Sequence, residues 1–421
     1  MGFASEYLGK HSFYKPFIMD APQSGVSMIV VIPCFNETGI IDSLVSLFKA
    51  HRPSFPLELI VVVNSPEGSC STITEQNKKT VVQVQQWSAV HYDPGFRVHV
   101  IDVPPFPAKH AGAGFARKTG MDEAVHRFNL LNNKQGIIVS FDSDSLCDSN
   151  YFTELEKCFS RPGIRGCTIY FEHLFGDDNS SQTGNPAIAE YELFLRYYVQ
   201  AMRWAGFPYA FHTIGSCFAV NSGTYAAQGG MNRKTAGEDF YFLHKIFPLG
   251  GVTELNTTRV IPSSRISDRV PFGTGATMKR LAGKKQRELY TYPLVSFRDL
   301  SELFSRMPEF FKCDKKGMTK IIGQLPCTLE SYLRKNDFVK AAEQMNKHST
   351  GLHTFRKRFY VWFNALRLLQ FLNFARYNYN DLPVSQAASS LLEKIDIPVL
   401  PGNSGLLQSY REMQRQTVWD I

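Results

Sequence analysis

The sequence predicts an α/β protein with a Rossmann-like, mostly parallel central sheet flanked by helices, followed by a mainly helical C-terminal extension. Short apolar, β-branched runs alternate with helix-like segments through the first half of the chain. One run, residues 137–141, ends directly at two carboxylates, Asp142 and Asp144. Beyond about residue 270, strand-like runs give way to segments rich in Lys, Arg, Leu and Phe. Alternation of strands and helices favours a parallel sheet with right-handed crossovers.

The N-terminal elements follow from apolar periodicity. Residues 28–33, Met-Ile-Val-Val-Ile-Pro, form an apolar run closed by proline, which is typical of a buried strand. Residues 38–50 carry apolar side chains at helical spacing and predict a helix. A second buried strand is predicted at 57–63. The alternation continues with helices at 72–90 and 113–128 and strands at 96–103, 137–141 and 166–171.

The pattern loosens after residue 176. A long helix is predicted at 186–204, a strand at 214–220 and a short helix at 239–247. At 421 residues the chain exceeds the usual size of one hydrophobic core. We therefore expect three regions, an N-terminal arm (1–25), an α/β domain (26–270) and a helical extension (271–421).

Composition places the chain among folded globular proteins, with 43% hydrophobic and 20% charged residues. Its net charge of +8 favours anionic ligands or an acidic membrane surface, and does not by itself indicate nucleic acid. The eight cysteines never fall in a C-x-x-C spacing and are expected to be free thiols in a reducing compartment. The N-terminus lacks a signal-peptide pattern, and no apolar run reaches the length of a membrane span. We expect a cytoplasmic protein, with the inner face of the membrane as a second location.

The two acids after residues 137–141 are the leading candidate site. A buried parallel strand delivers Asp142 and Asp144 to the sheet's carboxyl edge, where open α/β sheets bind ligands. Two hard oxygen ligands there suit a divalent metal, and a metal suits a diphosphate. An isolated Asp-x-Asp is more often a solvated turn or a helix cap. Its context therefore decides the interpretation.

Three motifs in sequence order supply that context: Pro33-Cys34-Phe35-Asn36-Glu37, Asp142-Ser143-Asp144 and Gly237-Glu238-Asp239. In this order the chain resembles the family-2 glycosyltransferases over roughly residues 26–270. The resemblance implies a GT-A type fold and a metal-dependent, inverting transfer of a sugar. The donor would be a nucleotide diphosphate sugar, and the acceptor a hydroxyl of a glycan or lipid-linked glycan.

The resemblance implies a nucleotide site after the first two strands. The family binds its nucleotide with the loop that follows the first strand, here Pro33 to Glu37. Phe35 is therefore expected to stack on the base, and Asn36 or Glu37 to form a hydrogen bond with the base or the ribose. Asn64 stands where the family usually has an aspartate that reads uracil. Asparagine offers both a donor and an acceptor, so UDP and GDP both stay open.

Residues 111–120 resemble the family's small-residue helix start, at which backbone N–H groups can approach an anion. Arg117 and Lys118 are expected to place positive charge near the base or diphosphate. The alternative is a tightly packed helix with two exposed cations.

The two acidic motifs receive separate roles by resemblance. Asp144 is expected to ligate Mn²⁺ or Mg²⁺, while Asp142 contacts ribose or donor sugar, or reaches the metal through water. Asp239 is expected to be the base that takes the acceptor's proton, with Glu238 orienting it or holding an acceptor hydroxyl. From the residues alone, Glu-Asp at a helix start is an ordinary N-terminal cap.

Two further segments are candidates. Residues 213–219 resemble the strand that lines donor sugar and acceptor, with Gly215 and Ser216 allowing close approach. Residues 263–269 carry Arg265 and Arg269, which either clamp the diphosphate or form a solvated loop.

Residues 355–379 are basic and aromatic. They predict either a helix buried between parts of the protein or an interfacial helix that brings the enzyme to a lipid-linked acceptor. Nucleotidyl transfer would want a basic, glycine-rich loop after the first strand, which residues 34–39 do not supply. The remaining alternative is a catalytically inactive nucleotide- or carbohydrate-binding module that acts as a membrane-surface scaffold.

Overall fold

The computed structural model describes residues 2–107, 112–174, 186–233, 237–265 and 288–421. The chain packs into two compact units. The sheet unit comprises residues 1–188, 213–284 and 414–421, and the helical unit comprises 189–212 and 285–413. Packing thus assigns 189–212 to the helical unit and 414–421 to the sheet unit. The domain limits at 25 and 270 expected from the sequence remain predictions.

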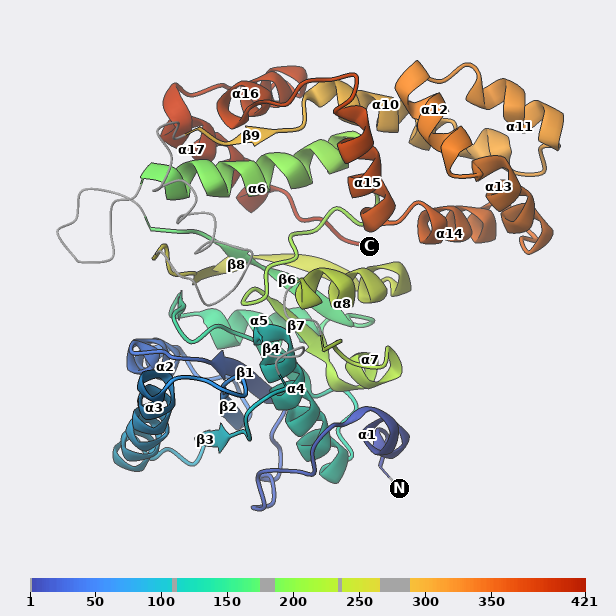
Figure 1. The fold of residues 1–421 in the computed structure, drawn as a ribbon. Helices are drawn as coiled ribbons and strands as arrows, with labels where there is room; N and C mark the ends of the chain where they lie inside the picture. Colours follow the sequence, from blue (N-terminus) through green and yellow to red (C-terminus); the bar gives the residue numbers. More distant parts are fainter. Residues whose placement is uncertain (1, 108–111, 175–185, 234–236, 266–287) are drawn as a thin grey trace. The chain divides into compact units, whose positions relative to one another are not determined.

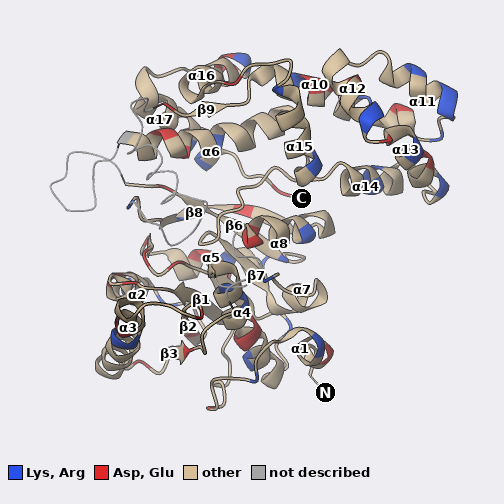
Figure 2. Cartoon of the chain, viewed as in Figure 1, with Lys and Arg blue, Asp and Glu red and all other residues tan. Residues whose placement is uncertain are grey.

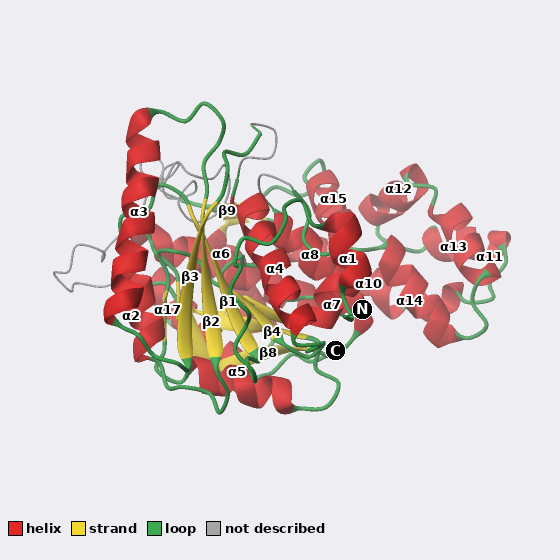
Figure 3. Cartoon of the chain, turned by 90° about the horizontal axis from the view of Figure 1, so that it is seen from below, coloured by secondary structure: helices red, strands yellow, loops and turns green. Residues whose placement is uncertain are grey.

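An eight-stranded sheet forms the centre of the sheet unit (Figures 1 and 3). In spatial order its strands are β3 (Phe96–Asp102), β2 (Leu57–Val63), β1 (Met28–Cys34), β4 (Ile137–Ser140), β7 (Phe218–Asn221), β6 (Gly166–Phe171), β8 (Val252–Ile261) and β5 (Leu146–Cys147). β7 runs antiparallel to β4 and β6, and β5 antiparallel to β8, while the other neighbours are parallel. Every residue of β1, β2, β4 and β6 is buried, as expected for strands covered on both faces.

Helices cover both faces of this sheet (Figure 3). They are α2 (Ile40–Lys49), α3 (Ser71–Val90), α4 (Ala113–Leu130), α5 (Tyr151–Ser160), α7 (Ser222–Ala227) and α8 (Glu238–Ile246). The N-terminal helix α1 (Ser5–His11) packs on α4 and α7. α4 lies directly on β1 and β2, because Gly120 lets the helix approach them. A Cβ at Gly120 would meet side-chain carbons of Val31 at 2.5 Å and Val62 at 2.7 Å.

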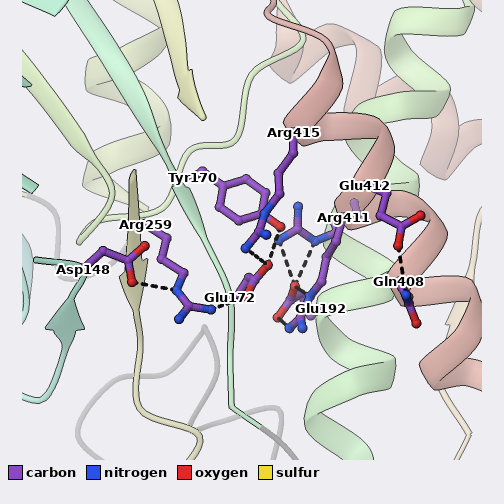
Figure 4. A network of polar contacts seen from close by, with 10 residues as sticks. Asp148, Tyr170, Glu172, Glu192, Arg259, Gln408, Arg411, Glu412 and Arg415 are labelled. Atoms are coloured by element: carbon purple, nitrogen blue, oxygen red, sulfur yellow. Dashed lines mark hydrogen bonds and ion pairs between the residues drawn. The ribbon is translucent and has the colours of Figure 1, made fainter. Parts of the chain in front are cut away.

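The C-terminal residues return to the sheet unit. Ile421 N–H donates to the carbonyl of Val252 at 3.0 Å, and Glu254 N–H donates to the carbonyl of Trp419 at 3.0 Å, so the segment pairs with the start of β8. Figure 4 shows the ion pairs beside it, in which Arg415 contacts Glu172 at 2.6 Å. Arg259 joins the same carboxylate to Asp148.

The helical unit contains most of α6 (Pro186–Trp204) and α17 (Gly402–Gln416), and a short hairpin, β9 (Tyr290–Thr291) with β10 (Leu382–Pro383). Its other helices are α10 (Leu294–Ser305), α11 (Lys315–Ile322), α12 (Cys327–Lys335), α13 (Phe338–Lys347), α14 (Leu352–Trp362), α15 (Ala365–Ala375) and α16 (Val384–Lys394). Two 3-10 turns, Phe247–Leu249 in the sheet unit and Met307–Phe310 here, complete the description. A buried pair ties this unit internally, since Arg411 bonds both carboxylate oxygens of Glu192 at 2.8 Å (Figure 4).

The predicted fold class is confirmed: a mostly parallel, helix-covered sheet and a mainly helical C-terminal part. Two local predictions were wrong. The strand expected at 214–220 covers only Phe218–Asn221, because Cys217 N–H donates to the carbonyl of Ile214 and closes a turn instead. The single segment 355–379 is two helices, since Asn364 caps the start of α15 by accepting from the N–H of Arg367.

Candidate functional site

The candidate site lies at the carboxyl edge of the sheet, where β1 and β4 end side by side. Asp142 and Asp144 follow β4, as the sequence predicts. Residues 35–37 follow β1, so Glu37 comes to the same edge from a separate strand. Gly237, with a left-handed φ of 71°, turns the chain into α8 and starts that helix with Glu238 and Asp239.

A buried arginine joins two of these acidic motifs. The guanidinium of Arg117 donates to Asp142 Oδ1 at 3.0 Å, to Ser140 Oγ at 2.7 Å and to Glu238 Oε1 at 3.4 Å. Arg117 is only 3% exposed. We call Arg117, Ser140, Asp142 and Glu238 the Arg117 cluster; it links the end of β4 to the start of α8.

Asp239 lies next to this cluster and is half-buried, whereas Glu238 is buried. One of its oxygens accepts the N–H of Phe240 at 2.7 Å. The other lies beside Gly215, where a Cβ would be 3.4 Å from Asp239 Oδ2 and 2.7 Å from Arg117 Nη2. The missing side chain at Gly215 therefore makes room for both groups.

A second arginine joins two other predicted residues. Arg265 Nη2 lies 2.9 Å from Asp144 Oδ2, and the same guanidinium bonds both carboxylate oxygens of Glu37, one of them at 2.9 Å. Glu37 is fully buried and also accepts the N–H of Gly39 at 2.8 Å. We call Glu37, Asp144 and Arg265 the Arg265 cluster.

The electrostatics of the edge favour protonation of two acids. Burial, followed by the charge of Asp142, raises the pKa of Asp144 to about 7, although Arg265 opposes this shift. Burial and the neighbouring Glu238 raise the pKa of Asp239 to about 7, although Arg117 opposes it. A carboxyl that titrates near neutral pH is suited to act as a base, whereas a carboxyl that ligates a metal must be deprotonated.

The two loops predicted to bind the nucleotide, which follow β1 and β2, are joined by hydrogen bonds. Asn36 has a left-handed φ of 47°, and its N–H donates to Asn77 Oδ1 at 3.0 Å. Asn77 in turn donates to the carbonyl of Asn64 at 2.8 Å, so it ties together the loops after β1 and β2. Phe35 is half-buried at this edge. Asn77 was missed from the sequence, because one asparagine in a polar helix carries no signal.

The remaining predicted residues that the structure describes have buried side chains. Lys118 faces away from the Arg117 cluster and is buried against Asp122 at 2.8 Å and Tyr7 of α1 at 3.2 Å. Pro33 and Ser216 are buried. Arg269 lies outside the described residues. Ser140, which no sequence pattern singled out, donates to the carbonyl of Gly215 at 2.5 Å.

The residues fit a divalent cation that takes few protein ligands. Among the described residues, no group of three His, Cys, Asp or Glu side chains is arranged to hold a metal. Asp142 and Asp144 are nevertheless partly exposed, with 38% and 25% of their side-chain surfaces accessible. Mg²⁺ is commonly held by one or two carboxylates together with substrate phosphates. Asp142 and Asp144 could supply these one or two carboxylates.

No protein-family model matches the chain, and no curated protein matches it. Several solved structures resemble the chain at low sequence identity, and one of them is a mannosyltransferase. S. aureus TarS 1–349 is 12% identical with a TM-score of 0.37, over 93% of this chain and 91% of that chain.

The mannosyltransferase PcManGT from Pyrobaculum calidifontis, solved with GDP-Man and Mn²⁺, is 12% identical with a TM-score of 0.35, over 98% of this chain and 92% of that chain. GalNAc-T7, solved with UDP, GalNAc and Mn²⁺, is 14% identical with a TM-score of 0.36, over 62% of this chain and 48% of that chain. These low TM-scores and identities assign no activity to the chain. Its function is therefore inferred from the chemistry of the site.

Proposed function

We propose that the chain is a metal-dependent glycosyltransferase of the GT-A, family-2 type. It transfers a sugar from a UDP- or GDP-linked donor to a hydroxyl of a glycan or lipid-linked glycan, with inversion at the anomeric carbon. The proposal combines the order of the three sequence motifs with the charges gathered at the carboxyl edge of the sheet.

One observation carries the proposal. Five carboxyl groups and only two guanidiniums meet in the Arg117 and Arg265 clusters and the adjoining Asp239. A diphosphate adds further negative charge, so it needs an added cation to bind at this edge. A divalent ion held by Asp144, with Asp142 beside it, supplies that charge. When bound, it stabilises the negative charge that develops on the leaving diphosphate.

The chain's own residues then divide the work. Asp239, half-buried and with its pKa raised to about 7, takes the proton of the acceptor hydroxyl. Phe35, Asn36 and Asn64 lie at the ends of β1 and β2, where they hold the base and ribose of the donor. Gly215 presents backbone rather than a side chain to the acceptor side.

The helical unit carries a basic surface that we propose binds a membrane. Residues 312–358, which we call the basic arm, carry eleven Lys and Arg, all exposed, against four Asp and Glu. This excess of seven positive charges is nearly the whole +8 of the chain, and Figure 2 shows the blue segments on α11 to α14. We propose that the arm meets an anionic membrane surface that carries a lipid-linked acceptor, at the inner face of the membrane.

This association would be peripheral. Within the described ranges, every helix is too short or too polar to cross a bilayer. Most large apolar side chains of 355–379, including Phe355, Phe359 and Phe371, are buried in the helical unit. Charge on the arm, rather than deep insertion of an apolar helix face, therefore supports the membrane proposal.

The inactive scaffold is the less favoured alternative. A binding module has no need for a half-buried carboxyl with a pKa near neutral beside the proposed nucleotide site, which is the arrangement of Asp239.

A nucleotide-binding experiment tests the proposed function directly. Thermal unfolding is measured with UDP, GDP, CDP and dTDP, each with Mn²⁺ or with EDTA. We expect one or two of the nucleotides to raise Tm in the presence of Mn²⁺ and not in EDTA. The nucleotide sugars that contain those nucleotides should then be turned over. No response to any nucleotide would favour the scaffold.

A further inference from the structure

All three nitrogens of the Arg117 guanidinium donate hydrogen bonds to other groups of the protein. Its three nitrogens donate separately to Glu238, Ser140 and Asp142, and the residue is 3% exposed. A cation that binds a nucleotide directly needs an accessible donor. The contacts of Arg117 therefore point to a role that acts through its neighbours.

We infer that Arg117 is a positioning residue, which holds Glu238 as a fixed counter-ion and thereby leaves Asp239 as the carboxylate that faces the acceptor. This inference rests on the proposed function and deepens it, because it separates two adjacent acids that the sequence alone cannot tell apart. It also replaces direct nucleotide binding as the role of Arg117.

The surroundings of the guanidinium support this assignment. Ser140 accepts from Arg117 at 2.7 Å and donates to the carbonyl of Gly215 at 2.5 Å, so the segment carrying Gly215 is tied to the end of β4. Gly215 in turn lies against Arg117 and Asp239. Arg117 and Ser140 therefore link both the start of α8 and the segment that carries Gly215 to the end of β4.

Arg117 also affects the pKa of Asp239. Burial raises the pKa of this carboxyl most. Glu238 on the same helix and Asp142 after β4 raise that pKa further, while Arg117 on α4 and the N–H of Phe240 lower it. Arg117 therefore keeps more of Asp239 deprotonated at neutral pH. Its loss is expected to displace the base and to make that base harder to ionise.

The test compares Arg117→Met and Arg117→Lys with Arg127→Met. Arg127 is a matched control: it lies on the same helix, is 1% exposed and pairs with the buried Glu58, away from the site. For Arg117→Met we expect kcat to fall by about 10²-fold, a clearly larger factor than the rise in the nucleotide diphosphate Kd, with partial recovery in Arg117→Lys. Arg127→Met should lower Tm with kcat and KM unchanged.

Two results would overturn the inference. A tenfold or larger rise in Kd with unchanged kcat would make Arg117 a nucleotide ligand, and a lower Tm with unchanged Kd and kcat would make it only structural. Should Arg117→Met fail to fold, Arg117→Met/Glu238→Gln removes both buried charges, and the same outcomes apply to it.

A carboxyl NMR titration keeps this inference separate from the proposed function, because it needs no substrate. The pKa of Asp239 should rise in Arg117→Met and stay at the wild-type value in Arg127→Met. Absence of nucleotide binding and turnover in the wild type would refute the proposed function. An unchanged Asp239 titration in Arg117→Met would refute the inference.

Discussion

Arg265 and Asp144 form an ion pair, with Arg265 Nη2 2.9 Å from Asp144 Oδ2. The arginine comes from the segment after β8 and the aspartate from the segment after β4, and Glu37 shares the same guanidinium. The protein thus places a cation of its own beside the carboxylate proposed to hold the metal. Under the proposed function, Arg265 would supply positive charge beside the bound diphosphate.

The first prediction concerns the metal. Asp144→Asn should weaken Mn²⁺-dependent binding of the nucleotide diphosphate by about 10–100-fold, because a neutral amide is a poorer ligand for a hard cation. Isothermal titration calorimetry in Mn²⁺ and in EDTA measures the effect. Asp148→Asn is the matched control, since Asp148 pairs with Arg259 outside the two clusters. Equal affinities for wild type and Asp144→Asn would remove Asp144 from the metal site.

The second prediction concerns the base. Asp239→Asn should leave nucleotide binding nearly intact and slow transfer by about 10²–10⁴-fold, because the acceptor hydroxyl then lacks a group to take its proton. Single-turnover kinetics with the matching donor and acceptor measure it. Near-normal turnover in this variant would show that another residue is the base, and Glu238→Gln would be the next variant to test.

The third prediction concerns pH. Asp239 acts only when deprotonated, and its raised pKa of about 7 means that kcat should fall as pH drops through about 7. Removing the neighbouring negative charge in Glu238→Gln should lower that pKa, so the acidic limb of the profile should move to lower pH. A kcat that stays constant as the pH falls from well above 7 to well below 7 would contradict the assignment.

The fourth prediction concerns the basic arm. Lys315→Glu/Lys316→Glu should reduce binding to vesicles of equal parts phosphatidylcholine and phosphatidylglycerol by about 10–100-fold, because each lysine near an anionic surface contributes about 1 kcal/mol. Sedimentation with vesicles measures it. Lys78→Glu/Lys79→Glu is the matched control, an adjacent exposed pair on α3. An equal loss in both variants would mean that net charge alone matters, not the arm.

The fifth prediction concerns packing in the sheet unit. Gly120→Ala should destabilise the protein by about 1–3 kcal/mol, because the new methyl group overlaps Val31 and Val62. Chemical denaturation measures it. Gly9→Ala is the matched control on α1, where a Cβ meets nothing within 4 Å, so it should be neutral or slightly stabilising. Similar losses in both variants would rule out the close approach of α4 to the sheet.

Local sequence signals determined the backbone of the sheet unit. The apolar run before Asp142 and the run before Cys34 each read as buried strands, and parallel strands bring their carboxyl ends to one edge. Gly237 before Glu238-Asp239 marked the start of a helix. These features depend on residues that are close in sequence, so their pattern could be read without the structure. The roles assigned to the site residues remain predictions.

Only the tertiary structure decided which charged groups meet. Successive residues on a helix point about 100° apart, so Arg117 faces Asp142 while Lys118 faces Tyr7, although the sequence pattern predicts one role for both. Arg265 meets Glu37 across 228 residues of chain. Contacts of this kind depend on how whole elements pack, and no local pattern encodes them. The sequence by itself determined which side chains arrive at the edge of the sheet, and packing decided their partners.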